Sequence, residues 1–183
     1  MYQHFTIPNF LSNQECNSLL IKCKEELVLK NASVGSGKVD FKSRKSSVAF
    51  IDDLGFLNNR LQNKLIELVK IKGFWVSGLQ SFQFTKYNLG EYYNWHRDSS
   101  IHSPAFSGRF YSTVIQLNDE YTDGELQLNI NNNEITLESG LGNLYMFPSY
   151  TMHRVKPITS GIRYSLVNWV KLVENKNEKK TLF

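Results

Sequence analysis

Two histidines and one aspartate in this chain could together bind a single metal ion. His96 and Asp98 are separated by one residue, and His153 follows 55 positions after Asp98. Side chains at positions i and i+2 of a β-strand point to the same face, so a strand here would present His96 and Asp98 together. A second histidine from a distant strand would complete a set of two imidazoles and one carboxylate. That set leaves the opposite positions of the metal open, and it is typical of non-haem Fe(II) centres that use dioxygen.

A basic residue lies ten positions beyond the second histidine. Arg163 could anchor an anionic co-substrate at such an iron, because a guanidinium presents a planar pair of donors that matches a carboxylate. On a strand, Ser165 would share the face of Arg163 and add a hydroxyl donor. Trp169 would occupy the same face, and we interpret it as a packing wall.

Two segments in the first half of the chain are predicted to be helices. Over about residues 12–30 apolar side chains recur with a helical period, and Ser12 with Glu15 forms a capping box at the start. A second amphipathic pattern runs over about residues 55–72. The stretch 32–47 between them is rich in Ser, Gly and Lys, which predicts a loop.

From Gly78 onward the hydrophobic pattern alternates with a period of two residues, which favours β-strands. Turn-forming residues separate the candidate strands, which are 81–87, 92–98, 110–117, 125–130, 134–138, 143–147, 153–157 and 162–170. Eight short strands after two helices predict a mainly β fold with flanking helices. The specific expectation is a double-stranded β-helix, or jelly roll, with the N-terminal helices packed on one sheet. We expect a single domain over 1–183, with helical support at about 1–77 and the catalytic jelly roll at about 78–172.

Composition is that of an ordinary globular protein. The 183 residues carry a net charge of +4, which permits an acidic partner without requiring nucleic acid. No run of about 18 apolar residues occurs, so no membrane span is expected. The start of the chain lacks the pattern of a secretory signal, and Cys16 and Cys23 would lie too far apart along a helix to form a disulfide. These features predict a cytoplasmic protein.

Six short blocks of sequence carry a resemblance to a known family. They are YNLGEYYNWHRD (87–98), RFYSTVIQLN (109–118), DGEL (123–126), GNLYMFP (142–148), HRV (153–155) and GIRYSLVNW (161–169). Between Gln83 and Trp169 the chain resembles the catalytic core of the 2-oxoglutarate- and Fe(II)-dependent dioxygenases, specifically the prolyl 4-hydroxylase-like branch. Residues 7–16 are similar to the opening of that branch, so the likeness covers most of the chain.

The resemblance implies an enzyme that hydroxylates an unactivated C–H bond with Fe(II), 2-oxoglutarate and O2, with ascorbate as a further candidate cofactor. The implied iron ligands are His96, Asp98 and His153. Arg163 would hold the distal carboxylate of 2-oxoglutarate, and Tyr87 and Ser165 would add contacts to it. Gln116 stands where some relatives have a tyrosine that contacts the co-substrate. It would either donate an amide hydrogen bond or only line the pocket.

A prolyl residue in a peptide or protein is the prime substrate that the resemblance suggests. The same chemistry on a nucleic acid or a small molecule is one alternative. Nucleic-acid demethylases of this fold typically carry a second arginine six residues after the first, where this chain has Trp169. A non-catalytic metal-binding jelly-roll module is the other alternative. The oligomeric state is left open.

Two polar loops, 32–47 and 99–108, are expected to flank the mouth of the iron pocket and to select the substrate. Tyr93 would either line the substrate side of the pocket or pack at a strand end. The basic residues of the first loop are interpreted as a solvated surface or, in a sharper alternative, as lid contacts to substrate; they are Lys38, Lys42, Arg44 and Lys45.

Overall fold

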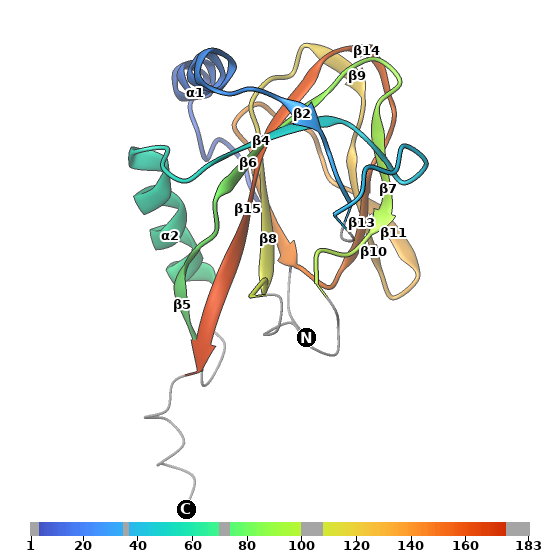
Figure 1. The fold of residues 1–183 in the computed structure, drawn as a ribbon. Coiled ribbons are helices and arrows are strands. Elements are labelled where there is room, and N and C mark those ends of the chain that lie inside the picture. The colour runs from blue at the N-terminus through green and yellow to red at the C-terminus, as the bar shows by residue number, and fades with distance from the viewer. Residues whose placement is uncertain (1–3, 35–36, 70–73, 100–107, 175–183) are drawn as a thin grey trace, which may run out of the picture.

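The computed structural model describes residues 4–34, 37–69, 74–99 and 108–174. Two antiparallel sheets face each other, and two helices cover the outer side of the larger sheet (Figure 1). Helix α1 spans Asn13–Glu26, and helix α2 spans Phe56–Leu68. The predicted fold class is confirmed: this is a mainly β jelly roll with N-terminal helices packed on one sheet.

The larger sheet runs across the middle of the molecule. Its strands in spatial order are β1 (Phe5–Ile7), β12 (Leu144–Pro148), β8 (Tyr111–Gln116), β15 (Arg163–Glu174), β6 (Phe82–Tyr87), β4 (Ser47–Ile51) and β2 (Lys30–Asn31). A further strand, β5 (Phe74–Leu79), pairs with the C-terminal part of β15.

The smaller sheet closes the other side of the jelly roll. Its strands in spatial order are β11 (Asn133–Thr136), β10 (Leu126–Ile130), β13 (Met152–Val155), β7 (Tyr92–His96) and β3 (Arg44–Lys45). A separate two-stranded ribbon joins β9 (Tyr121–Asp123) to β14 (Ile158–Gly161).

Strand β6 shows how sequence alternation divides the interior into two parts. Phe82 and Phe84 are fully buried in the core that the larger sheet shares with the helices. Gln83 and Thr85, which alternate with them, are also buried but hydrogen-bond to each other, and Gln83 lines a cavity between the sheets. Because successive side chains on a strand point to opposite faces, one strand serves both an apolar core and a polar interior.

Both helices face the larger sheet with one apolar stripe. The buried side chains are Cys16, Leu19 and Cys23 on α1, and Leu57, Leu61 and Leu65 on α2. Their spacing of three or four residues is that of an amphipathic helix. The predicted capping box is present, because the Ser12 backbone N–H donates to Glu15 Oε2 at 2.9 Å and the Glu15 N–H donates to Ser12 Oγ at 3.2 Å. Both cysteines are buried and unpaired.

All eight predicted strands are present, with ends displaced by a few residues. The helices end earlier than predicted, because Leu27 and Val69 leave the helical conformation. The sequence also missed short strands, including β3 and the start of β4 inside the predicted loop 32–47. A strand of two or three polar residues at a sheet edge shows no alternation, so the pattern cannot predict it. No helix in the described ranges is long and apolar enough to cross a membrane.

Candidate metal centre and adjoining cavity

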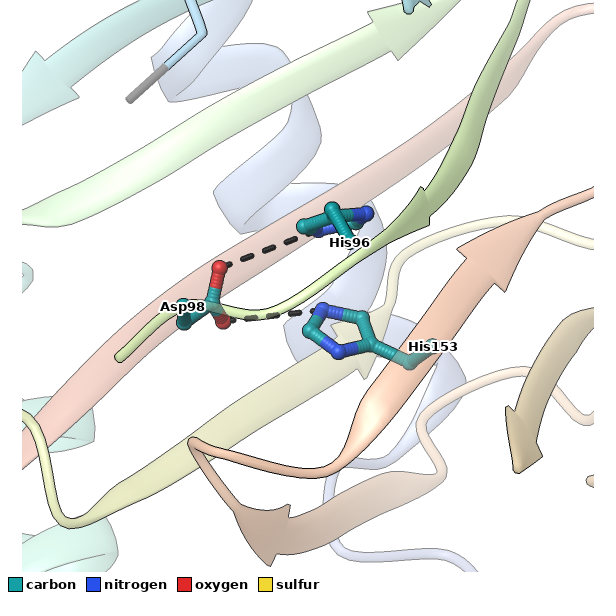
Figure 2. Close-up of side chains that lie close together, drawn as sticks. All are labelled: His96, Asp98 and His153. Atoms are coloured by element: carbon teal, nitrogen blue, oxygen red, sulfur yellow. Dashed lines mark ion pairs between the residues drawn. The ribbon is translucent and has the colours of Figure 1, made fainter. Parts of the chain in front are cut away.

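The three predicted ligands come together at one point between the sheets. His96 on β7 and His153 on β13 are directly paired across the smaller sheet. Asp98 lies just beyond the end of β7, with Oδ1 3.7 Å from His96 Nε2 and Oδ2 3.6 Å from His153 Nε2 (Figure 2). One potential ligand atom from each residue lies within 4.8 Å of the others. One cation could therefore contact all three, since N/O–metal bonds are near 2 Å.

Backbone carbonyls orient both imidazole rings. His96 Nδ1 lies 2.8 Å from the Asn94 carbonyl oxygen, and His153 Nδ1 lies 2.8 Å from that of Thr151. A carbonyl only accepts hydrogen bonds, so each Nδ1 carries a proton, and in the neutral form of each ring Nε2 keeps its lone pair. These hydrogen bonds therefore select the tautomer that can bind a metal through Nε2.

The carboxylate of Asp98 is held from the larger sheet. Ser112 Oγ on β8 donates to Asp98 Oδ2 at 2.6 Å, and Trp169 Nε1 on β15 donates to the same oxygen at 2.9 Å. Although burial alone would raise the pKa of Asp98, the two histidines and these two donors bring it below its usual value. The carboxylate is therefore ionised and oriented. The sequence had suggested that Trp169 only packs against the site. Its indole N–H also orients Asp98, one of the three predicted ligands.

The predicted strand 92–98 includes Asp98, but β7 ends at His96 and Asp98 lies just beyond it. Backbone contacts explain this position. The N–H groups of Asp98 and Ser99 both donate to the Ser149 carbonyl, at 2.9 and 3.1 Å. Ser149 Oγ also lies 2.9 Å from Ser112 Oγ, the donor to Asp98. This junction between the two sheets places the carboxylate opposite both histidines.

Aromatic rings pack against both histidines. The Tyr93 ring stacks on the His96 ring, with centroids 3.4 Å apart and an interplanar angle of 12°. The Arg44 guanidinium lies 4.5 Å from the Tyr93 centroid, and Phe147 packs against His153 with centroids 4.6 Å apart. Burial raises the pKa of Tyr93 to about 12, so it stays protonated. Burial, together with His153, lowers the pKa of His96.

A cavity of about 340 Å³ adjoins the three ligands and contains Arg163 on its wall. Arg163 is only 2% exposed, although it carries a full positive charge. Its Nη1 donates to Ser165 Oγ at 3.3 Å, its guanidinium lies 5.6 Å from the Tyr87 ring centroid, and its Nε has no hydrogen-bond partner. Among the described residues, no carboxylate lies within ion-pair distance of it.

The turn before β10 makes room for Arg163. Asp123 and Gly124 both have positive φ, 61° and 71°. A Cβ on Gly124 would lie 2.1 Å from Ile158 Cδ1 and 3.4 Å from Arg163 Cδ, so only glycine fits against these side chains.

Three of the four residues predicted to contact the co-substrate line this cavity: Tyr87, Arg163 and Ser165. Gln116 does not line it. Its Nε2 donates to the Asn118 carbonyl at 3.0 Å, and its Oε1 accepts from Tyr145 Oη and from the Gly140 N–H, each at 3.3 Å. A contact between Gln116 and the co-substrate stays a prediction that this arrangement does not favour.

The first predicted loop does reach the cavity, since Ser33, Val34, Gly37 and Arg44 line it. Arg44 is 6% exposed, so its interpretation as a solvated loop residue is wrong. Of the second loop, residues 100–107 lie outside the described ranges. The sequence also missed Ser112 and Ser149, because a serine in a strand or turn has no pattern of its own.

The family model of the 2OG-Fe(II) oxygenase superfamily matches residues 82–171, which include all three ligands and Arg163. Residues 82–171, about half of the chain, therefore belong to the 2OG-Fe(II) oxygenase superfamily. Among curated relatives, a PKHD-type hydroxylase of Idiomarina loihiensis is 31% identical over 99 residues, covering 54% of this chain and 45% of the relative. One from Synechococcus sp. (strain JA-2-3B'a(2-13)) is 29% identical over 110 residues, covering 57% of this chain and 49% of the relative.

Solved structures share the fold of this chain along nearly its whole length. A Trichoplax adhaerens prolyl hydroxylase in complex with a hypoxia-inducible-factor peptide fragment has a TM-score of 0.77 and 19% identity, covering 98% of this chain and 87% of that chain. A Pseudomonas putida prolyl-4-hydroxylase has a TM-score of 0.73 and 20% identity, with coverages of 93% and 94%. These likenesses establish the fold. The chain spans about half the length of the curated relatives that it matches.

Proposed function

We propose that this protein is an Fe(II)- and 2-oxoglutarate-dependent dioxygenase that hydroxylates an unactivated C–H bond. The observation that carries the proposal is Arg163, a buried cation without a counter-charge among the described residues, in the same cavity as a ready set of metal ligands. A metal site alone would suit many functions. A metal site with a buried anion receptor beside it suits a co-substrate that both chelates the metal and carries a distal carboxylate.

The donor set fits Fe(II). The ion would be bound by His96 Nε2, His153 Nε2 and an oxygen of Asp98, and all three residues line the cavity in which a co-substrate could bind. This ligand set is the one used by non-haem Fe(II) oxygenases, whereas structural zinc sites close four positions with protein ligands. When bound, iron, 2-oxoglutarate and O2 would supply the oxidising chemistry, and the protein would supply orientation.

Arg163 would bind the distal carboxylate of 2-oxoglutarate. An unpaired buried charge costs several kcal/mol in a protein interior, and a partner with good hydrogen bonds offsets that cost. The guanidinium matches a carboxylate with two parallel donors, and Ser165 Oγ lies beside it to add a third. Tyr87 completes the polar wall from the neighbouring strand, where it is paired with Arg163.

Apolar side chains on the same cavity would keep water away from the co-substrate. Val114, Leu126, Val155 and Val167 line it from four strands of the two sheets. A water-poor site strengthens the Arg163–carboxylate interaction and limits side reactions.

A prolyl residue in a peptide or protein is the proposed prime substrate. Support comes from the fold shared with prolyl hydroxylases, one of which was solved with a peptide fragment. A nucleic-acid substrate has less support, because Trp169 occupies the position of the second arginine and is engaged with Asp98. A non-catalytic metal-binding module has less support too, because such a module would have no use for a buried, unpaired Arg163.

The direct test is succinate formation from 2-oxoglutarate by the Fe(II)-loaded chain. Proline-bearing peptides and methylated oligonucleotides would be compared as stimulating substrates, with ascorbate added in parallel. We expect basal turnover that a chelator abolishes and that peptides stimulate more than oligonucleotides do. Failure of the iron-loaded protein to bind 2-oxoglutarate would contradict the proposal.

A further inference from the structure

The mouth of the cavity contains arginines that neither the metal nor the co-substrate would use. Arg44 and Arg97 both line the cavity, as does Arg109, which donates to Gln80 and lies over Trp169. Among the described lining residues the only carboxylate is Asp98, which is committed to the metal centre. Arg44 and Arg97 therefore leave excess positive charge on this cavity, and charge-lined clefts attract ligands of opposite sign.

Arg44 is the most constrained of these cations. It is 6% exposed, its Nε donates to Ser46 Oγ at 2.8 Å, and its Nη1 donates to the Ser33 carbonyl at 3.5 Å. Its remaining contact is the face of the Tyr93 ring. All these partners are neutral, and no described carboxylate lies within ion-pair distance. A desolvated guanidinium with only neutral partners is a site for an incoming anion.

Arg97 adds a second, exposed cation, between His96 and Asp98 in the sequence. Like Arg44, it makes no ion pair with any described residue. Asp40 is the acid nearest to Arg44 in the sequence. Its carboxylate accepts hydrogen bonds from Ser43 Oγ at 2.6 Å and from the Lys42 N–H at 3.0 Å.

The charges deeper in the site would already be balanced. In the proposed complex, Fe(II) and Arg163 together carry as much positive charge as Asp98 and 2-oxoglutarate carry negative charge. Arg44 and Arg97 are then left for the prime substrate. Their charge would serve recognition, because complementary charges raise association rates and suppress wrong partners.

We propose that the prime substrate is an acidic peptide, with a Glu or Asp side chain next to the hydroxylated residue that binds Arg44 and Arg97. This inference rests on the proposed function, since it assumes that a peptide enters this cavity. A peptide is favoured over a nucleic acid because the basic side chains converge on one pocket of about 340 Å³ and the net charge is only +4. Nucleic-acid binding instead needs a basic groove that follows the phosphate backbone.

The test compares three fluorescein-labelled peptides of equal length that carry Glu, Gln or Lys on both sides of a central proline. Binding is measured by fluorescence anisotropy to the full chain loaded with Fe(II) and 2-oxoglutarate without oxygen. We expect the Glu peptide to bind about 10-fold or more tightly than the Gln peptide, as for hydrogen bonds to charged groups. The Lys peptide should bind most weakly, and added salt should reduce the preference for Glu.

Variants then assign the preference to the named residues. Arg44→Gln should remove most of the Glu-over-Gln preference, and Arg44→Lys should restore part of it. Arg97→Gln should reduce the preference by about 1.5- to 5-fold, as for an exposed ion pair. Lys22→Gln is the matched control, since Lys22 forms an exposed i,i+4 pair on α1 and loses the same charge. A merely structural effect of Arg44 would weaken Glu and Gln peptides equally and leave their ratio unchanged.

Equal binding of the Glu and Gln peptides would overturn the inference, as would tighter binding of a single-stranded oligonucleotide than of the Glu peptide. Succinate formation is scored separately in the same protein preparations. A chain that prefers the Glu peptide but forms no succinate would contradict the proposed function and leave the acidic-peptide site standing. A chain that forms succinate without any charge preference would support the proposed function and contradict the acidic-peptide site.

Discussion

The two faces of the larger sheet are built from the same strands but obey different rules. Toward the helices, Phe84 and Leu166 belong to an apolar core in which water exclusion is the main requirement. Toward the smaller sheet, Arg163 and Ser165 are just as buried but are polar. A buried charge needs an opposite charge, so one on the inner face that pairs with no described carboxylate indicates a place for an anionic ligand. The comparison separates residues that hold the fold from residues that hold the chemistry.

The largest effect should come from the inner face at Asp98→Asn. The amide has nearly the shape of the carboxylate and can keep bonds to Ser112 and Trp169, so the fold should survive. Loss of the charged ligand should weaken Fe(II) binding by more than the roughly 100-fold seen when an outer partner of a ligand is removed, and succinate formation should disappear. Metal content after gel filtration and a succinate assay would measure this. Retention of wild-type iron content would show that Asp98 is not a ligand.

On the outer face, Leu61→Ala should act on stability alone. Leu61 is fully buried on α2, so truncation should lower the free energy of unfolding by about 2–5 kcal/mol. The folded fraction should keep its 2-oxoglutarate affinity, because this core lies on the opposite side of the sheet from the cavity. Urea unfolding and co-substrate titration would be measured on the same preparation. A weakened affinity at full folding would mean that the two faces are coupled.

Arg163→Lys should weaken 2-oxoglutarate binding and leave iron binding intact. Lysine keeps the charge but loses the paired donors, at a cost of about 1.5–3 kcal/mol, or roughly 10- to 150-fold in affinity. Titration of the metal-loaded protein would give the ratio.

Arg163→Met sharpens the same point. It should abolish co-substrate binding while leaving the ligand-free protein as stable as the wild type or more so, because an unpaired buried charge has been removed. A thermal melt without ligand would test this. A large loss of stability would indicate that Arg163 has a structural counter-charge.

Trp169→Phe removes one donor to Asp98 but keeps most of the ring. We expect about 10- to 100-fold weaker Fe(II) binding, the usual effect of losing an outer partner of a metal ligand. Trp75→Phe is the matched control, because Trp75 is 54% exposed on β5. If both variants bound iron like the wild type, the indole of Trp169 would be only a packing wall.

The smallest effect should come from Glu15→Gln in the helical layer. Glu15 caps α1 and pairs with Arg60 on α2 at 2.7 Å, and the Arg60 hydrogen bond is the main cause that lowers its pKa to about 2. An exposed pair of this kind contributes about 0.2–1 kcal/mol. Because the folded pKa is depressed, this stability should be present above about pH 4.5 and lost as the pH falls toward 2. Unfolding of both proteins across that range should converge at low pH, with activity at neutral pH unchanged.

The sequence by itself determined the alternation of the strands, the two helices and the identity of the chemically active side chains. These are local properties: a period of two residues assigns Gln83 and Phe84 to opposite faces wherever the strand lies. The prediction that His96, Asp98 and His153 form one metal site likewise needed only the assumption that their two segments lie side by side. The resemblance to a family then implied which chemistry these residues perform.

The tertiary structure decided everything that depends on which strands lie side by side. The bond from Trp169 to Asp98 joins residues 71 positions apart, and the burial of Arg44 depends on pairing between β3 and β7. Gln116 is turned away from the cavity by partners on other segments, at residues 140 and 145. No local sequence pattern encodes these contacts, because they depend on how distant strands pair and how the two sheets pack. The absence of a counter-charge at Arg163 among the described residues is of the same kind, since only packed neighbours can show that none is present.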